Sequence, residues 1–321
     1  DRAFDMLGDS ILKDRVVDGD APEFQIDEVE LDPSDPLIAR KISGSYTVPC
    51  FLSPDCGPGS TMELDADGLP TRNGNYEANM ECIVPEAAFA PDAPKMRPMV
   101  FGHGLFGNAS GVAGGPNPPL AATGMILCAT DEIGMSTSDV AQVMTKALKD
   151  LSDFDVLADR LAQALLNELY LARLMYHPQG LGTHPNFQDG NGFTDGESLI
   201  STDEVFYMGA SQGGILGGPL TALSPDFIQS SLLVGAMNYS ILLPRSIDFD
   251  LYAQIMYPNY PKELERPLLF ELMQMLWDRS EPNGYAHVMT DNPPPDTPEH
   301  KVTLQIALGD HQVSNFASEN M

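Results

Sequence analysis

The residues with the clearest chemical potential form the pattern Gly209-x-Ser211-x-Gly213, a serine between two glycines. The pattern directly follows the apolar run 205–208 and precedes small and apolar residues that predict a helix. A serine in a strained strand-to-helix turn presents its hydroxyl only when the residues two before and two after it carry no bulky side chain. A helix beginning near Gln212 directs backbone N–H groups toward the serine oxygen. The pattern predicts a nucleophilic Ser211; the alternative is a glycine-rich turn that happens to contain serine.

A second candidate segment is the loop that begins at His103 and reads His-Gly-x-x-Gly, directly after the apolar run 99–102. Such a loop can bring a backbone N–H close to an oxyanion that develops during attack on an acyl carbon, and glycine favours the close approach. The predicted oxyanion donors are the N–H groups of Leu105 and Gln212. We expect His103 to anchor the loop through its ring N–H rather than to act as the catalytic base.

The elements that must position these residues belong to the α/β class, because short apolar runs alternate with helical patterns from Arg97 onward. The expected strands are 99–102, 125–129, 205–208, 231–234 and 302–308. A helix is predicted over about 153–176, where apolar residues recur at spacings of three and four, and a second over 267–277. The pattern predicts a mostly parallel central sheet with helices on both faces.

The domain organisation expected from composition has two parts. Residues 1–95 are rich in Asp, Pro and Gly, and the alternating stretches 41–48 and 78–84 predict a strand-rich N-terminal extension. Residues 96–321 form the predicted catalytic domain, with a Met- and Tyr-rich cap or lid around 238–290 that would cover an apolar acyl pocket. Plain core packing would explain most of these Met and aromatic residues equally well.

Charge excludes one large class of partner. The 321-residue chain carries 17 Lys and Arg against 46 Asp and Glu, a formal net charge of −29. A nucleic-acid-binding protein needs basic residues to neutralise phosphates, and no basic patch is present. The long uncharged stretches are interrupted by Gly, Asn and Pro, so no transmembrane segment is expected.

Four cysteines, Cys50, Cys56, Cys82 and Cys128, carry the evidence on redox environment. The first three cluster in the loop-rich N-terminal part and form no Cys-x2-Cys zinc pattern. We expect at least one disulfide among them and a compartment outside the reducing cytosol. Cys128 lies within the apolar run 125–129, and we expect it to be a buried small hydrophobe.

The serine pattern and the His-Gly loop together resemble the α/β-hydrolases, in particular bacterial secreted esterases and lipases. The resemblance covers about 97–321 and implies an α/β-hydrolase fold, a serine esterase that needs no cofactor, and a secreted, periplasmic or cell-surface location. It also implies that Asp310 is the catalytic acid, because the predicted strand 302–308 ends in Gly-Asp with Val313 three residues later, similar to the acid turn of that family. A solvated turn is the alternative for Asp310, and Asp248 and Asp250 are then the reserve candidates.

The catalytic base is the difficulty in this interpretation. The family pattern places a histidine tens of residues after the acid, and none of the six histidines stands there. His311 is a weak candidate, because adjacent side chains diverge and Asp310 could hardly orient it toward Ser211. The predicted strand 302–308 would also have an exposed apolar edge without a last neighbour. We therefore expect the last strand and the base to lie outside the given residues, on a C-terminal fragment or on a second chain.

Two further possibilities follow from the same residues. Asp189, Asn191 and Asp195 offer oxygen ligands at short spacing, as a calcium loop would, but an acidic surface turn is the favoured interpretation. The predicted partner is a small or polymeric ester. The alternatives are a thioesterase or peptidase that uses the same apparatus, and a catalytically inactive binding or assembly subunit that keeps the fold.

Overall fold

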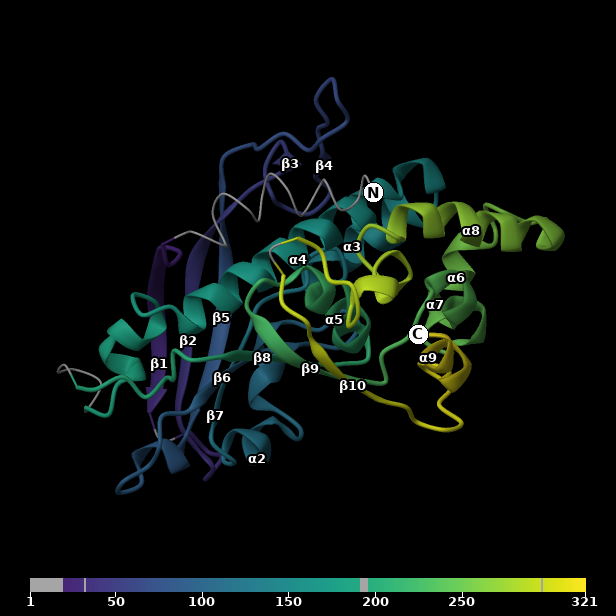
Figure 1. Ribbon diagram of the computed structural model, residues 1–321. Coiled ribbons are helices and arrows are strands. Elements are labelled where there is room, and N and C mark those ends of the chain that lie inside the picture. Colours follow the sequence, from purple (N-terminus) through teal and green to yellow (C-terminus); the bar gives the residue numbers. More distant parts are fainter. Residues whose placement is uncertain (1–19, 32, 191–195, 296) are drawn as a thin grey trace.

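The computed structural model describes residues 20–31, 33–190, 196–295 and 297–321. A mixed eight-stranded sheet forms its centre, with the order β1-β2-β5-β7-β6-β8-β9-β10 and helices packed on both faces (Figure 1). The neighbours from β7 through β6, β8 and β9 to β10 are parallel, whereas β1, β2, β5 and β7 pair antiparallel. The chain therefore has the mostly parallel α/β sheet that the sequence predicts, extended by an antiparallel part.

The strands of the described chain have the following bounds. They are β1 (Phe24–Leu31), β2 (Ile38–Pro49), β3 (Leu52–Ser53), β4 (Thr61–Met62), β5 (Asn75–Pro85), β6 (Arg97–Gly102), β7 (Met125–Ala129), β8 (Val205–Ala210), β9 (Phe227–Leu233) and β10 (Lys301–Gln305). The short strands β3 and β4 pair with each other outside the main sheet. The predicted strand 302–308 is shorter than expected, because the chain after Gln305 leaves the sheet.

The α-helices are α2 (Asn117–Ala121), α3 (Val140–Gln142), α4 (Asp155–Tyr176), α5 (Gln212–Leu223), α6 (Tyr239–Leu242), α7 (Phe249–Met256), α8 (Arg266–Trp277) and α9 (Asn315–Asn320). The two helices predicted over 153–176 and 267–277 appear as α4 and α8. Between β9 and β10 the chain forms α6, α7 and α8, which lie together at one end of the sheet (Figure 1).

Helix α4 is buried on all sides, which its sequence pattern alone did not predict. Every residue from Val156 to Met175 is buried. The helix packs against β6, β7 and β8 on one side and against β3, β4 and α8 on the other. Three of its charged residues form ion pairs, with Arg160 bonded to Asp139 at 2.6 Å, Arg173 to Asp226 at 2.7 Å and Asp159 to Arg279 at 2.9 Å. A helix enclosed in this way holds the strand-rich N-terminal part and the catalytic part together.

The N-terminal residues join the same sheet as the rest of the chain. Strand β5 pairs with β7, so that β1, β2 and β5 extend the sheet that contains β8. Pairing across the expected boundary at residue 95 places both parts in one sheet. The division into an extension and a catalytic domain stays a prediction of the sequence.

The cysteines form two disulfides, Cys50–Cys56 and Cys82–Cys128. The first confirms the expected bridge in the N-terminal part. Cys128 is fully buried, as expected, but it is not the independent core residue that the sequence predicts, because Cys82 and Cys128 are register partners on β5 and β7 with Cα atoms 4.1 Å apart. Sequence alone could not show this pairing, since the two strands are 46 residues apart. Two disulfides fit an oxidising compartment.

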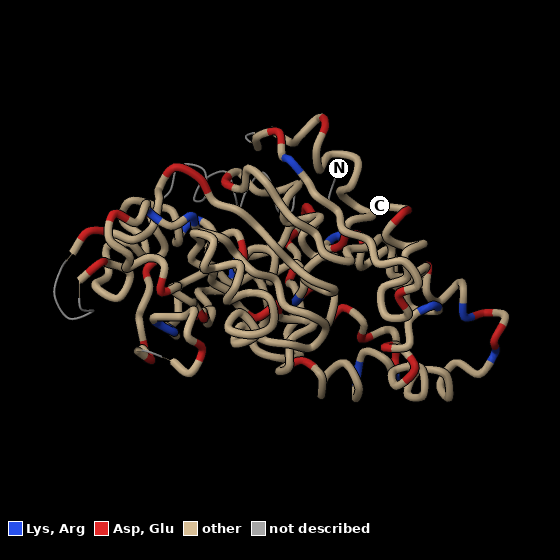
Figure 2. The backbone as a smooth tube through the Cα atoms, turned by 90° about the horizontal axis from the view of Figure 1, so that it is seen from below, with Lys and Arg blue, Asp and Glu red and all other residues tan. Residues whose placement is uncertain are grey.

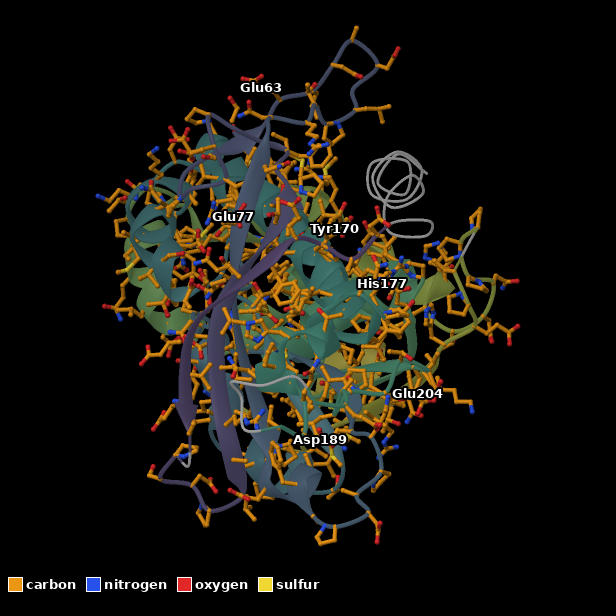
Figure 3. The ribbon with its side chains drawn as sticks, turned by 90° about the vertical axis from the view of Figure 1, so that its left-hand side faces the viewer. Glu63, Glu77, Tyr170, His177, Asp189 and Glu204 are labelled. Carbon is orange, nitrogen blue, oxygen red and sulfur yellow. A yellow bond between two sulfur atoms is a disulfide. The ribbon has the colours of Figure 1, made fainter. Side chains whose placement is uncertain are left out.

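The surface is acidic throughout. Figure 2 shows Asp and Glu spread over the whole chain trace, with few Lys and Arg among them. Glu63, Glu77 and Glu204 belong to this acidic surface on the side that carries β1 (Figure 3). None of the described helices combines the length and the apolar character that crossing a membrane requires.

Candidate active site

Ser211 occupies the sharp turn between β8 and α5 that the sequence predicts. Its backbone has φ 57° and ψ −118°, a region that residues other than glycine rarely adopt. The turn is held by the Ser211 N–H, which donates to the Leu233 carbonyl on β9 at 2.9 Å. A strained residue persists only where its surroundings enforce the conformation. The turn presents the Ser211 side chain to two cavities, as described below.

The two glycines that flank this turn have a steric explanation. A Cβ atom on Gly209 would lie 2.2 Å from the Gly213 carbonyl oxygen, and one on Gly213 would lie 2.3 Å from the Gly102 carbonyl carbon and oxygen. All of these contacts are with backbone atoms, which cannot move aside as a flexible side chain would. The start of α5 therefore lies directly against the end of β6, where the His103 loop begins.

The His103 loop and the turn at Ser211 are joined by hydrogen bonds. The Gly213 N–H donates to the His103 carbonyl at 2.8 Å. The His103 ring is buried; its Nδ1–H donates to the Gly104 carbonyl at 2.8 Å, and its Nε2 accepts the Glu132 N–H at 2.9 Å. Burial also lowers the pKa of His103, which favours the neutral ring that this bonding pattern requires. His103 thus anchors the loop, as expected, and has no free nitrogen for proton transfer.

Both predicted oxyanion donors are available. Leu105 follows the anchored His103, and Gln212 is the first residue of α5. Among the described residues no backbone or side-chain acceptor receives either N–H. Leu105, Gln212 and Ser211 line the same cavity. Oxyanion stabilisation during acyl transfer requires N–H groups without another acceptor near the nucleophile, and the role of Leu105 and Gln212 as these donors stays a prediction.

Buried polar groups lie beneath the contact between the Ser211 turn and the His103 loop. The Tyr207 hydroxyl donates to the Gly213 carbonyl at 2.6 Å. The Glu132 carboxyl is fully buried, lies 3.8 Å from His103 Nδ1 and has no hydrogen-bond partner in the described chain. Burial, and secondarily the neighbouring carboxyl of Glu168, raises the pKa of Glu132 well above its ordinary value. Burial thus favours the neutral form of the Glu132 carboxyl beneath the loop. Sequence reasoning did not single out Glu132.

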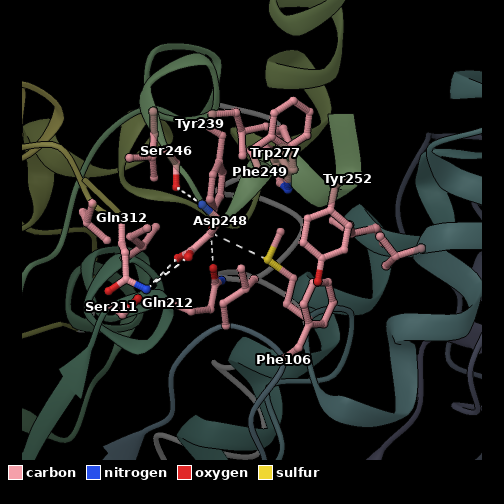
Figure 4. Close-up of a pocket in the computed structure, with 18 of the residues that line it drawn as sticks. Phe106, Ser211, Gln212, Tyr239, Ser246, Asp248, Phe249, Tyr252, Trp277 and Gln312 are labelled. Atoms are coloured by element: carbon pink, nitrogen blue, oxygen red, sulfur yellow. Dashed lines mark hydrogen bonds between the residues drawn. The ribbon is translucent and has the colours of Figure 1, made fainter. Parts of the chain in front are cut away.

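Two cavities of different character meet at Ser211, and Figure 4 shows residues that line the first of them. The first has a volume of about 80 Å³ and an apolar wall that includes Phe154, Met273 and Trp277. The second is open, has a volume of about 830 Å³, and is lined largely by the glycines, Asn108 and Ser110 of the loops after β6. Ser211 thus lies where a narrow apolar space and a wider space of mixed polar and apolar lining join.

The predicted acid and base do not line either cavity. The Asp310 carboxylate accepts the N–H groups of Gln312 and Val313 at 2.7 and 3.1 Å, within its own turn. His311 is exposed, and its carbonyl accepts the Ile247 N–H at 2.9 Å. Of the six histidines, only His103 lines the open cavity, and none lines the narrow one. The structure therefore does not bring His311 to the serine.

A different carboxylate lies beside the serine. Asp248 lines both cavities with Ser211, and its two carboxylate oxygens accept the Gln312 side-chain amide at 3.1 and 3.3 Å (Figure 4). Figure 4 shows Asp248 and Gln312 together on the side of the pocket nearer to Ser211, with Phe106 and Tyr252 on the other side. Asp248 was only a reserve candidate, because the sequence did not show that the chain after β9 returns over the serine.

The calcium-loop candidates receive no support as a site. Asn191 and Asp195 lie outside the described residues. Asp189 accepts the Glu197 N–H at 2.8 Å with its carboxylate, as a residue of an ordinary turn does, and Figure 3 labels it on the side of the molecule that carries β1. Within the described ranges no group of His, Cys, Asp or Glu residues is arranged to hold a metal ion.

Comparison with known proteins identifies the fold. No protein-family model matches the chain, and no curated protein matches it. Among solved structures, acetyl xylan esterase 1 from Thermoanaerobacterium sp. JW/SL YS485 is similar with a TM-score of 0.53 and 17% identity, over 99% of this chain and 81% of that one. The chain has the α/β-hydrolase fold. An acetyl xylan esterase from Paenibacillus sp. R4 is similar with a TM-score of 0.52 and 15% identity, over 94% of this chain and 79% of that one.

The α/β-hydrolase fold explains why the separate motifs converge. In this fold a loop after one parallel strand and a turn after its neighbour meet at the carboxyl edge of the sheet. Here β6 and β8 are adjacent and parallel, with Gly102 paired to Gly209. The two motifs, more than 100 residues apart in sequence, therefore begin from paired residues.

Proposed function

We propose that the protein is a serine hydrolase that cleaves carboxylic esters through an acyl-enzyme. The observation that carries the proposal is the Ser211 turn, where a strained serine, two free N–H donors and two cavities meet. The Ser211 oxygen attacks the acyl carbon while the Leu105 and Gln212 N–H groups stabilise the oxyanion. The bond to the alcohol oxygen breaks, and the alcohol leaves with the proton taken from the serine. Water then attacks the acyl carbon and releases the acid.

The two cavities support a division of the ester between them. The narrow cavity is lined by apolar side chains and suits an apolar acyl group. The open cavity is wider and suits a larger alcohol part. Asp248 is its only acidic side chain, and no Lys or Arg lines it. An uncharged alcohol part is therefore favoured over an anionic one.

We propose that the base is a histidine outside the described residues, on a segment packed beside β10, and that Asp310 orients it. The support is that no free histidine ring lines the cavities. The outer edge of β10 has no partner strand in the described chain. The apolar residues that follow this strand are exposed, with Leu308 at 84%. A secreted or cell-surface location, consistent with the two disulfides, belongs to the same proposal.

The test uses a chromogenic ester with the chain of residues 1–321, with and without added imidazole. Removing one member of a catalytic triad typically costs several orders of magnitude in rate. We expect low activity that rises with imidazole, because imidazole can replace the missing ring. Ser211→Ala measures the hydrolysis that imidazole causes by itself, and His311→Ala should behave as the unchanged chain does. Full activity without imidazole would place the base among the six histidines, and no Ser211-dependent turnover in either condition would favour an inactive binding protein.

A further inference from the structure

The direction of the Leu105 N–H is set by the carbonyl group of the same peptide bond. A trans peptide is planar, so its C=O and its N–H point in opposite directions. The bond between Gly104 and Leu105 is trans. The Gly104 carbonyl accepts hydrogen bonds from His103 Nδ1 at 2.8 Å and from the Gly107 N–H at 2.9 Å. The contacts that hold these two donors in place therefore fix the direction in which Leu105 presents its N–H.

The turn of residues 134–137, which follows β7, holds the far side of this loop. The Phe106 N–H donates to the Met135 carbonyl at 3.0 Å. The Gly107 carbonyl accepts the Thr137 N–H at 2.9 Å, and the Thr137 hydroxyl donates to the Phe106 carbonyl at 2.8 Å. Phe106 has a φ of 51°, which a residue other than glycine keeps only where its surroundings enforce it. The 134–137 turn therefore supplies the bonds that hold the loop in shape beyond Leu105.

A single buried side chain, that of Asp139, holds the 134–137 turn. Its Oδ2 accepts three hydrogen bonds from the turn, which come from the Gly134 N–H at 2.8 Å, the Ser136 N–H at 3.2 Å and the Ser136 hydroxyl at 2.7 Å. Gly134, Ser136 and Asp139 are all buried. Without the carboxylate, three buried donors would lose their acceptor, which is costly enough to make the turn change shape.

The other oxygen of Asp139 is held by Arg160 of α4. Arg160 Nε donates to Asp139 Oδ1 at 2.6 Å. Its Nη1 donates to the carbonyls of Cys56 and Gly57 at 2.6 and 2.5 Å. Cys56 belongs to the Cys50–Cys56 disulfide. Two elements far apart in sequence, the N-terminal disulfide loop and α4, thus fix the carboxylate that holds the turn.

We propose that Asp139 is a positioning residue for ester hydrolysis, which fixes the direction of the Leu105 N–H by holding the 134–137 turn. The proposal rests on the proposed serine hydrolase and gives a role to a residue that lines neither cavity. Arg160 acts through Asp139. The alternative is a carboxylate that only stabilises the fold. Its loss would then lower the melting temperature and leave the folded site as it is.

The test variant is Asp139→Asn, which keeps the size of the side chain and removes its charge and one acceptor oxygen. Asp226→Asn is the matched control, because Asp226 is buried and pairs with Arg173 of the same helix at 2.7 Å. Asp226 directly precedes β9, whose first residue pairs with the first residue of β8, so it lies at the end of the sheet opposite to Ser211. Both substitutions should lower the melting temperature, since each leaves a buried arginine without its partner.

Hydrogen exchange of the folded proteins tests the positioning without catalysis. The N–H groups of Phe106 and Gly107 are both hydrogen-bonded in the unchanged protein, and the amides of β8 report opening of the whole sheet. Relative to the β8 amides, Phe106 and Gly107 should exchange at least about tenfold faster in Asp139→Asn than in Asp226→Asn, because only the first variant frees the loop. Equal relative exchange in the two variants would overturn the proposal.

Kinetics with a matched pair of esters test the oxyanion contact itself, with imidazole present and the Ser211→Ala rate subtracted. A thionoester has sulfur in place of the carbonyl oxygen, and sulfur accepts hydrogen bonds weakly, so its hydrolysis depends less on oxyanion donors. Asp139→Asn should lower kcat on the oxygen ester by about a hundredfold, as a misplaced donor does, with KM changed less than about threefold. Its kcat on the thionoester should fall much less. Asp226→Asn should keep the ratio of the two rates, and an unchanged ratio in folded Asp139→Asn would make Asp139 structural only.

A second variant covers the case in which Asp139→Asn does not fold. Thr137 is exposed, and Thr137→Val removes the hydroxyl bond to the Phe106 carbonyl without emptying the core. We expect the ratio of the two rates to fall by about tenfold in Thr137→Val, and no change in this ratio would count against the turn as the support of the loop. No turnover of the oxygen ester by the unchanged protein would contradict the proposed function, whereas the exchange comparison still decides whether Asp139 holds the loop.

Discussion

The two sides of the candidate site are built differently. On one side, the Ser211 turn and the His103 loop lie against each other with backbone contacts, buried rings and hydrogen bonds between them. The other side consists of segments that leave the sheet and carry Asp248, Asp310 and Gln312. The hydrogen bonds of these side chains are formed within one turn or between exposed groups. The first side is fixed by the fold, whereas the second depends on what packs beside it.

This difference has a chemical meaning. Oxyanion stabilisation depends on N–H donors that are already in place before the reaction, because moving them into place would use up part of the transition-state stabilisation that they provide. A buried junction between β6 and α5 supplies that rigidity. Proton transfer needs a side chain that can move between partners, and such a group can be carried by a later and more exposed segment. The comparison predicts that substitutions on the first side affect stability and catalysis together, whereas those on the second affect catalysis alone.

The largest effect is expected from Gly213→Ala. The new Cβ would lie 2.3 Å from backbone atoms of Gly102, so that α5 must move away from the His103 loop. We expect destabilisation of several kcal/mol and loss of at least about a thousandfold in kcat. Thermal unfolding and ester hydrolysis measure the two effects. Gly111→Ala is the stability control, because a Cβ there would meet nothing within 4 Å, and equal melting of the two variants would refute the close-packed junction.

A smaller effect, confined to catalysis, is expected on the second side. In protein that hydrolyses the ester without imidazole, Asp310→Asn should lower kcat by about 10³ to 10⁴ with an unchanged melting temperature, as expected for the residue that orients a base. Asp248→Asn should change kcat less than tenfold, because its neighbour is the neutral amide of Gln312. The reverse order would make Asp248 the catalytic acid and remove the role of Asp310.

The smallest expected effect is a pH dependence of stability in the cap. Burial raises the pKa of Glu281 to about 8, from an ordinary value of 4.5. Glu281 accepts a hydrogen bond from Gln274, which in turn accepts the Ser240 N–H of α6 at 2.9 Å. Because the folded state holds the proton more tightly, this contribution is fully present below pH 4.5 and is lost as the pH rises to about 8. Denaturation at several pH values measures this. Between pH 5 and 8 the free energy of unfolding of Glu281→Gln should fall less than that of the unchanged protein. The same dependence on pH in both proteins would contradict a neutral Glu281.

The sequence predicted the first side of the site well for a local reason. The Gly-x-Ser-x-Gly and His-Gly patterns are short, and the backbone shape that they require excludes most other residues. The apolar runs around them also predicted β6, β7 and β8. These interactions are encoded within a few residues, so a single sequence is enough to find them.

The second side could not be predicted in the same way. Asp248 lines the same cavities as Ser211 because the chain after β9 returns to the site through α6 and α7, and no short pattern near residue 248 shows that path. The Cys82–Cys128 bridge depends on the register of β5 against β7. Glu132 follows an ordinary strand, and only its burial beneath His103 gives it a role. Each of these depends on contacts between distant segments.

The central claim is that Ser211 is the nucleophile, and covalent labelling tests it most directly. The chain of residues 1–321 is treated with a fluorophosphonate in the presence of imidazole and then digested for peptide mass spectrometry, with Ser211→Ala treated in parallel. The account predicts one label per chain, on Ser211, and no label on the variant. Label on another residue, or equal labelling of Ser211→Ala, would contradict it.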